Sequence, residues 1–191
     1  MAKNRVEFGI CNLHVGLFTV ADDGTVTMGT PYHQEGARSF SPEQDSNENT
    51  AYADNIAYWS EYTEGPFSGD LVAMLFDDNF KEQFLGYVRT NKGGLGHRKG
   101  TIKPRVYVAF EIDGDAEKRK AIFYNCSLGS INRPYETIED TKEPVNETLP
   151  VTCTGDNASG LFMEVLKPGD PGYDDLFTNP SAPGLDEDSE S

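Results

Sequence analysis

Apolar residues near the N-terminus follow the pattern of a strand and its hairpin partner. Residues 6–20 form a strand-like run of Val, Ile, Leu and Phe that two glycines interrupt. Asp22-Asp23-Gly24 follows, and Asp and Gly readily adopt the backbone angles of a tight turn. Residues 25–28 then alternate between Thr and an apolar side chain. The segment therefore predicts a β-hairpin.

Four more apolar runs lie in the second half of the chain. Residues 105–112 and 121–128 are rich in β-branched and aromatic side chains, and they predict a central hairpin. Residues 147–154 and 161–166 flank a Gly-Asp-Asn turn and predict a last hairpin. With the N-terminal hairpin and two further strands expected near residues 56–62 and 71–76, these runs indicate a mainly β protein of at least eight strands.

Aromatic residues are concentrated between residues 51 and 87, which hold nine of the chain's 21. Residues 56–62 alternate with a period of two, and rings fall on both faces of the expected strand. Gly65-Pro66 predicts a turn, and residues 71–76 are apolar on both faces, as in a strand covered on both sides. We expect this stretch to be organised around two strands and a helix.

The single helix is predicted over residues 77–86. Residues 77–79 are acids and an amide, which accept hydrogen bonds from the free amides of a first helical turn. Phe80 and Phe84 then fall on one face at i, i+4, and Gly86 is suited to end the helix. The two rings are expected to dock the helix on the sheet.

A polar segment at residues 34–51 leads into the aromatic stretch. Ser, Asn, Gln, Asp and Glu dominate it and leave little apolar surface to bury. Two structures fit this composition: a long exposed loop, or the tip of a protruding hairpin. Segments of this length are usually functional when they are ordered.

The net charge of −16 is unevenly distributed. Residues 1–88 carry 14 acids against 4 bases, whereas residues 89–120 carry 9 bases against 4 acids. Residues 121–167 return to 7 acids against 3 bases, and 7 acids and no base follow Lys167. A surface that grips DNA through its phosphates needs clustered Lys and Arg, so the balance argues against DNA binding.

The length of 191 residues fits one domain with extended termini. We expect a β domain at residues 1–167, and an acidic arm or disordered tail at residues 168–191, where Pro, Gly, Asp and Ser dominate. No apolar run is long enough to span a membrane, and no apolar signal core follows the N-terminus. We expect synthesis and retention in a cytoplasm.

No motif in the sequence indicates an enzyme, a cofactor or a metal. The three cysteines are odd in number and lack a C-x-x-C pair, which predicts free and mostly buried thiols; the scattered histidines are expected to be structural. The glycine-rich basic loop at residues 91–100 has neither the dinucleotide spacing nor the Gly-Lys-Thr order of a phosphate-binding loop. No nucleophile elbow or complete calcium loop is present.

The order of short motifs over residues 6–166 resembles the siphophage major tail protein family, the subunits of the tail tube. Each motif alone is weak, but their order across the domain is fairly specific. Besides the predicted helix, they are Phe8-Gly9, Asn12-Leu13-His14, Asp23-Gly24-Thr25-Val26, Gly29-Thr30-Pro31, Tyr52-Ala53-Asp54-Asn55-Ile56, Gly69-Asp70-Leu71, Lys92-Gly93-Gly94, Phe110-Glu111-Ile112-Asp113-Gly114 and Tyr124-Asn125-Cys126.

The resemblance implies a fold, an assembly and a set of partners. The fold would be a tail-tube β-sandwich or barrel with one flanking α-helix, and six copies would form rings that stack into a tube around the tape measure protein. The tube would end on tail terminator and distal tail proteins and belong to a virion assembled in the host cytoplasm. Strands of six subunits would close a lumenal barrel, whose acids would let DNA pass without specific binding.

The same resemblance implies that the aromatic and basic segments contain subunit contacts. The polar segment and both termini would reach neighbouring copies, and Tyr58 and Trp59 would lie on opposite faces of their strand. The candidate interface residues are Tyr52, Asp54, Asn55, Tyr58, Trp59, Tyr62, Lys92, Arg98 and Lys99. Lys103, Lys118, Arg119 and Lys120 are likewise expected outside the lumen, at contacts between subunits or rings.

Two functions from other classes compete with this reading. A host-surface or carbohydrate-binding β-sandwich would use the Tyr and Trp side chains of residues 52–62 as a platform on which sugars stack. A hydrolase would use paired carboxylates, and the sequence offers no pair that we can place across a cleft.

Overall fold

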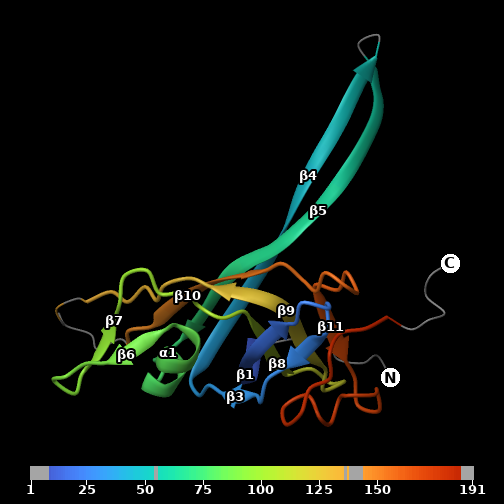
Figure 1. Ribbon diagram of the computed structural model, residues 1–191. Coiled ribbons are helices and arrows are strands. Elements are labelled where there is room, and N and C mark those ends of the chain that lie inside the picture. The colour runs from blue at the N-terminus through green and yellow to red at the C-terminus, as the bar shows by residue number, and fades with distance from the viewer. Residues whose placement is uncertain (1–8, 54–55, 136, 138–143, 186–191) are drawn as a thin grey trace.

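The computed structural model describes residues 9–53, 56–135, 137 and 144–185, and at residues 51–53 and 56–58 it describes the backbone alone. Seven strands follow one another in a twisted antiparallel sheet in the order β2-β1-β8-β9-β10-β5-β4, with β3 added on β1 and β11 on β9; β6 and β7 form a separate small sheet (Figure 1). The elements are β1 (Gly9–Val20), β2 (Val26–Met28), β3 (Tyr32–His33), β4 (Ala37–Ala53), β5 (Ile56–Ala73), α1 (Asp78–Phe84), β6 (Tyr87–Arg89), β7 (Leu95–His97), β8 (Val106–Asp113), β9 (Lys120–Leu128), β10 (Glu147–Cys153) and β11 (Met163–Leu166). The mainly β fold with one helix is confirmed for the described residues.

Three predicted local structures are confirmed. β1 and β2 pair as a hairpin, and β8 and β9 pair as the central one. The helix begins where the sequence indicates, because the Asp77 carboxylate accepts a hydrogen bond from the Phe80 amide at 2.7 Å. It ends at the predicted glycine, since Gly86 has a φ of +69°, a conformation that glycine adopts without strain.

The predicted hairpin of β10 with β11 is wrong. Both strands pair with β9 instead: β11 with residues 120–123, and β10 with residues 126–128. The change of partner falls around Asn125, which has a φ of +49° and whose carbonyl accepts a hydrogen bond from the Thr154 amide. The turn residues between the two runs therefore make a wider connection that places both strands along one edge of β9.

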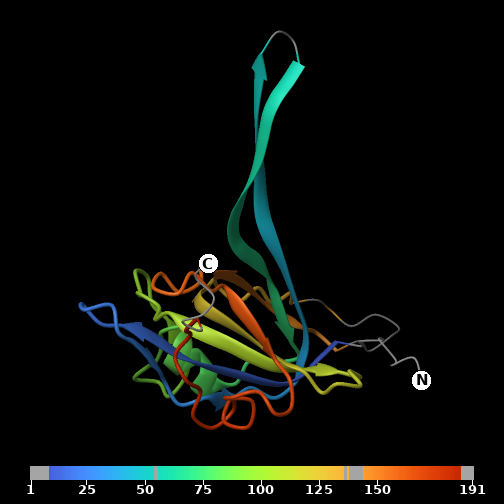
Figure 2. The ribbon, with the colours of Figure 1, turned by 90° about the vertical axis from the view of Figure 1, so that its right-hand side faces the viewer.

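The predicted turn at Gly65-Pro66 is also wrong, because β5 runs through these two residues without a break. The pairing of β4 with β5 shifts register between Gln44 and Ser46, opposite Gly65-Pro66. A proline is tolerated at such a bulge, where its missing amide proton leaves no ladder hydrogen bond unmade. Of the two structures that fitted residues 34–51, the protruding hairpin is the one observed: β4 and β5 rise far above the body of the molecule (Figures 1 and 2).

The core lies on both faces of the sheet, and β8 shows how one strand serves both. Val106, Val108 and Phe110 point into one cluster, which also receives α1. Tyr107 and Ala109 point into a second cluster on the opposite face. Side chains of a strand alternate between faces, so a run of apolar residues without alternation is what a strand covered on both sides requires.

The second cluster is closed by the chain that follows β11. Leu176 in this segment is 3% exposed, and the Phe177 ring stacks on the His14 ring at a centroid distance of 4.4 Å. The Tyr173 hydroxyl donates a hydrogen bond to the Lys118 carbonyl at 2.7 Å. Residues 168–185 thus pack on the body of the domain, although their composition led us to expect an arm or a disordered tail.

The predicted state of the cysteines is confirmed. All three are free; Cys126 and Cys153 are buried, and Cys11 is partly exposed. Cys126 and Cys153 lie opposite each other in the pairing of β9 with β10, inside the first core cluster. Burial raises the pKa of the Cys126 thiol well above its usual range, so this group is an inert part of the core.

Candidate functional site

The outer half of the β4–β5 hairpin, residues 45–53 and 56–66, has the features of a surface that contacts a partner. We call it the distal ribbon. β10 pairs with β5 only as far as Phe67, so beyond that residue neither outer edge of the ribbon has a strand partner among the described residues. All the side chains described at residues 45–49 and 59–64 are exposed. A two-stranded ribbon without a core is marginally stable in water, which favours a role in contact with a partner.

The distal ribbon is strongly acidic. Residues 45–66 contain five acids and no Lys, Arg or His. The whole stretch from residue 39 to residue 80 has no basic residue either. No carboxylate in the described part of the ribbon is neutralised by a cation of its own chain, so the ribbon presents a negative surface.

Two large rings stand on opposite faces of the ribbon. Trp59 is 50% exposed and Tyr62 is 65% exposed. The ladder between them is regular, with Trp59 opposite Ala51 and Tyr62 opposite Glu48. Positions three residues apart on a strand face opposite ways. The two rings therefore do not form one flat platform.

Of the four remaining aromatic and polar candidates, two belong to the far end of the ribbon. Tyr52 and Tyr58 belong to β4 and β5, where the structure describes the backbone alone. Asp54 and Asn55 lie outside the described residues. The ladder shifts register between Ala51 and Tyr52, and Tyr58 is the residue left without a partner there, so the expected opposition of Tyr58 and Trp59 stays a prediction.

The basic candidates are on a different surface. Lys92 lies in the turn that joins β6 to β7, and Arg98 and Lys99 follow β7 directly; all three are exposed. This small sheet lies against the body beside α1, whereas the ribbon leads away from the body (Figure 1). The structure thus divides the candidates that it describes between two separate surfaces of one molecule.

Three other basic residues expected at subunit contacts are engaged within the chain. Lys103 donates hydrogen bonds to the carbonyls of Leu128 and Gly129. The Lys120 ammonium is buried, donates to the Tyr173 carbonyl at 2.9 Å, and lies 4.1 Å from the centre of the Tyr173 ring. These lysines secure their own domain. Lys120 is too buried to face a neighbouring subunit, whereas Lys103 is partly exposed and its place at a subunit contact stays a prediction.

Arg119, in the same basic run, is likewise bound within the chain. Its Nε atom lies 2.6 Å from a carboxylate oxygen of Asp115, four residues earlier in the sequence. The Arg119 side chain and nearby backbone amides hold the pKa of the Asp115 carboxyl well below its usual range. Lys118 remains exposed and is the member of the run that fits the expectation.

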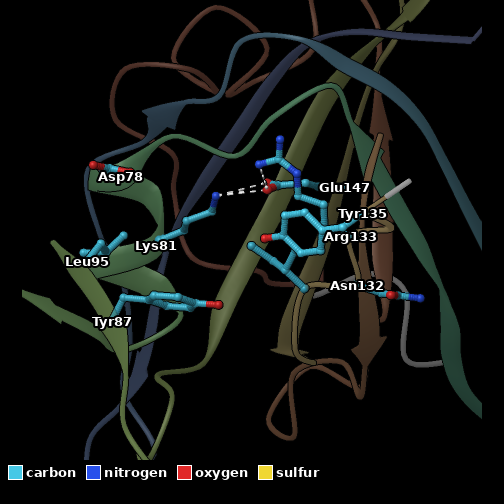
Figure 3. A pocket seen from close by; sticks show the side chains of 9 residues that line it. Asp78, Lys81, Tyr87, Leu95, Asn132, Arg133, Tyr135 and Glu147 are labelled. Carbon is cyan, nitrogen blue, oxygen red and sulfur yellow. Dashed lines mark hydrogen bonds and ion pairs between the residues drawn. The ribbon is translucent and has the colours of Figure 1, made fainter. Parts of the chain in front are cut away.

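A pocket of about 400 Å³ lies between the β6–β7 sheet, α1 and the start of β10 (Figure 3). Glu147 at its base is 2% exposed, and its carboxylate accepts hydrogen bonds from the Lys81 ammonium at 3.2 Å and from Arg133 at 3.3 Å. The Tyr135 ring at the rim is 88% exposed, and Tyr87 and Leu95 complete the wall. Sequence reasoning missed this pocket, because its charges come from three segments without a characteristic spacing.

The part of the chain that the structure describes contains neither a candidate metal site nor a candidate membrane-spanning helix. No group of three or more His, Cys, Asp or Glu side chains there is arranged to hold a metal ion. No helix among these residues is long and apolar enough to cross a membrane.

Comparisons with known proteins give a weak structural likeness and no match in sequence. No family model matches the chain, and no curated protein matches its sequence. Among solved structures, the chain is similar to the tube-terminating cap of the anti-feeding prophage, with 10% sequence identity and a TM-score of 0.43. The alignment covers 87% of this chain and 99% of the cap chain. A likeness of this degree assigns the chain neither a family nor an activity.

Proposed function

We propose that the protein is a structural virion protein: the major tail protein of a long, non-contractile phage tail, which forms hexameric rings that stack into a tube. The observation that carries the proposal is the distal ribbon. It holds two exposed rings, open strand edges and a block of unneutralised acids, all outside the core of its own domain. Such a ribbon is suited to be ordered and covered by neighbouring copies.

Two further features support this role. The order of sequence motifs over residues 6–166 matches the tail-tube family, and the mainly β fold with one helix on its flank is the architecture which that resemblance implies. A net charge of −16 is also suited to a conduit, because carboxylates near the lumen repel the phosphate backbone and let DNA slide without specific binding.

The proposed role defines partners and a place. Copies of the chain would contact one another within and between rings, and the tube would enclose the tape measure protein. Tail terminator and distal tail proteins would bind its two ends. Assembly would take place in the host cytoplasm, and the finished protein would belong to the virion. The protein would have no catalytic function.

The carbohydrate-binding alternative is not favoured by the arrangement of the rings. A sugar-stacking platform needs aromatic faces that lie side by side, and Trp59 and Tyr62 stand on opposite faces of a ribbon only two strands wide.

The test is electron microscopy of the purified protein at high concentration, with a hairpin-shortened variant as the matched comparison. In the variant, residues 47–63 are replaced by Asn-Gly, so that the paired residues Ser46 and Glu64 flank a two-residue turn. We expect rings or tubes from the full chain and folded monomers from the variant. A full chain that remains monomeric at every concentration, or a shortened variant that assembles equally well, would refute the proposal.

A further inference from the structure

One face of the distal ribbon combines two acids with an aromatic ring. Glu48 lies directly opposite Tyr62 in the ladder, and Glu64 is two residues further along the same strand, so all three share a face. The Thr50 hydroxyl donates a hydrogen bond to Glu48 at 3.3 Å, as expected for neighbours on that face. We call this surface, Glu48, Tyr62 and Glu64, the acidic face.

The β6–β7 sheet lies in a segment of opposite composition. Residues 83–110 contain six Lys and Arg and no acid, in contrast to the base-free stretch at residues 39–80. Arg89 is neutralised by Glu82 at 2.5 Å. Lys92, Arg98 and Lys99 form no ion pair within the described part of the chain. These three cations leave the small sheet with an open positive surface.

The pocket beside this sheet is suited to receive an aromatic side chain flanked by carboxylates. Tyr87 of β6 and Leu95 of β7 line it, so the pocket and the basic surface are continuous. Arg133 and the exposed Tyr135 ring stand together at its rim, with the guanidinium carbon 5.5 Å from the ring centroid (Figure 3). An arginine beside an aromatic ring is a common centre of protein interfaces.

The acidic face cannot meet this surface within one molecule. The distal ribbon extends by about 30 Å, given about 3.4 Å per residue over residues 45–53 of β4. It leads upward from the body, away from β6 and β7, in both views (Figures 1 and 2). The complementary surface is therefore available only on another copy.

We propose that the acidic face of one copy binds the β6–β7 surface of a second copy, with Tyr62 at the pocket beside Arg133 and the two glutamates against Lys92, Arg98 and Lys99. The inference rests on the proposed function and names the receptor for the ribbon. A contact between two different surfaces is heterologous, and it continues from copy to copy into a ring or a helical filament. Each subunit would donate one ribbon and receive one.

Charge reversal with rescue tests this pairing. The ribbon variant is Glu48→Lys with Glu64→Lys, and the sheet variant is Lys92→Glu with Lys99→Glu. We expect each variant alone to stay folded and to raise the critical concentration for assembly at least tenfold, because like charges then meet. A 1:1 mixture should co-assemble, since the basic ribbons of the first variant fit the acidic sheets of the second. All four substitutions in one chain should also restore assembly.

Two control variants carry the same changes in net charge elsewhere on the surface. Asp22→Lys with Glu35→Lys matches the ribbon variant, and Arg38→Glu with Lys167→Glu matches the sheet variant; all four positions are exposed. The controls should assemble like the unaltered chain. Equal effects of the controls, or loss of assembly without rescue in the mixture and in the fourfold variant, would overturn the inference.

The outcomes separate this inference from the proposed function. If the unaltered chain forms tubes and the reversed variants do so equally well, the pairing is wrong and the tube subunit stands. If the unaltered chain never assembles, both fail. Tyr62→Ala and Tyr135→Ala add a second measurement: combined, they should raise the critical concentration no more than either alone, because they remove one contact. Additive effects would place Tyr62 elsewhere.

Discussion

At the scale of single residues, Glu147 is the charged group most deeply built into the fold. One of its oxygens accepts a hydrogen bond from the Phe76 amide at 2.8 Å. The Lys81 ammonium lies 3.1 Å from the same oxygen, and Arg133 contacts the other. The carboxylate thus joins the start of β10 to α1, to the segment before α1 through Phe76, and to the segment before β10 through Arg133. A buried carboxylate is tolerable here because each oxygen has donors and the charge is opposed.

We predict that Glu147→Gln lowers the free energy of unfolding by about 3 kcal/mol, since the Lys81 side chain, 13% exposed, loses its counter-charge. Lys167→Ala is the control: its pair with Glu117 is 3.7 Å long and exposed, and such pairs contribute at most about 1 kcal/mol. Urea denaturation of both variants gives the comparison. Equal, small losses would show that the Glu147 cluster is dispensable.

His14 makes the closure of the second core cluster sensitive to pH. Its ring is stacked between His33 and Phe177, and burial lowers its pKa below the usual 6.5 despite a hydrogen bond to the Asn12 carbonyl. His33 and Lys120 also oppose its protonation, whereas Glu111 favours it. The unfolded chain therefore binds a proton on His14 at a pH where the folded chain does not. Stability from this residue is complete above about pH 6.5 and declines as the pH falls below that value.

We predict that His14→Phe keeps the ring stack on Phe177 and flattens the decline in melting temperature between pH 7 and pH 5. After a constant offset is removed at pH 7, the two proteins should differ most at the acidic end, where the unaltered chain has lost the contribution of neutral His14. Melting curves at several pH values measure the difference. Parallel pH profiles for the two proteins would exclude His14 as the titrating group.

At the scale of elements, the close approach of β4 to β5 depends on glycine. A Cβ atom on Gly69 would lie 2.1 Å from the Ser41 carbonyl oxygen and 2.8 Å from the Cα atom of Pro42. Both are backbone atoms, so the strands would have to separate. We predict that Gly69→Ala lowers the free energy of unfolding by about 2 kcal/mol, the usual cost of overpacking. Gly94→Ala meets only the Thr90 hydroxyl at 3.7 Å and should change the stability little.

Under the proposed function, we expect the ribbon to contribute to assembly and not to the stability of the domain. The Trp59 ring is half exposed and does not belong to the core of the domain. We predict that Trp59→Ala leaves the melting temperature unchanged and weakens assembly by about 2 kcal/mol, as for a ring at the centre of an interface. Thr19→Ala, exposed on β1 and outside the ribbon, is the control. An early-melting Trp59→Ala variant, or one that assembles normally, would contradict an interface role for this residue.

Local signals decided which elements were predictable. The helix and the β1–β2 and β8–β9 hairpins follow from caps, turns and alternation that lie within a few residues of one another. The partners of β10 and β11 depend on β9, more than 20 residues away, and no local signal encodes that choice. Gly65-Pro66 has the sequence of a turn, but the pair stays inside β5 because these two residues lie opposite the single residue Asp45 of β4, at a register shift.

The candidate site was predictable only in its parts. Exposure of Trp59, Tyr62 and the three cations follows from composition, because a polar segment has too little apolar surface to bury them. Their division between two distant surfaces depends on the whole sheet. Lys120 shows the same limit: it sits in a basic run typical of a solvated surface, and only the return of the C-terminal segment buries it beneath Tyr173.

At the scale of the whole molecule, two electrostatic effects of opposite sign act on assembly. In the proposed assembly, copies with a net charge of −16 would repel one another at long range, while the ribbon and the β6–β7 surface would attract at short range. Salt screens distant charges first: the Debye length falls from about 30 Å at 0.01 M to about 10 Å at 0.1 M and about 3 Å at 1 M. Repulsion between whole subunits is therefore removed at salt concentrations that still leave contacts of about 4 Å largely intact.

We predict that tube length passes through a maximum as sodium chloride is raised from 0.01 M to 1 M. The first addition of salt should lengthen tubes by screening the net charge, and further salt should shorten them by screening the contacts themselves. The fourfold charge-swapped chain should follow the same curve, because its net charge and its complementary pairs are both preserved. Measuring tube lengths by electron microscopy at six salt concentrations gives the curve. Tubes of constant length would show that opposite charges do not hold the subunits together, and a steady increase up to 1 M would assign assembly to apolar burial, which salt does not screen.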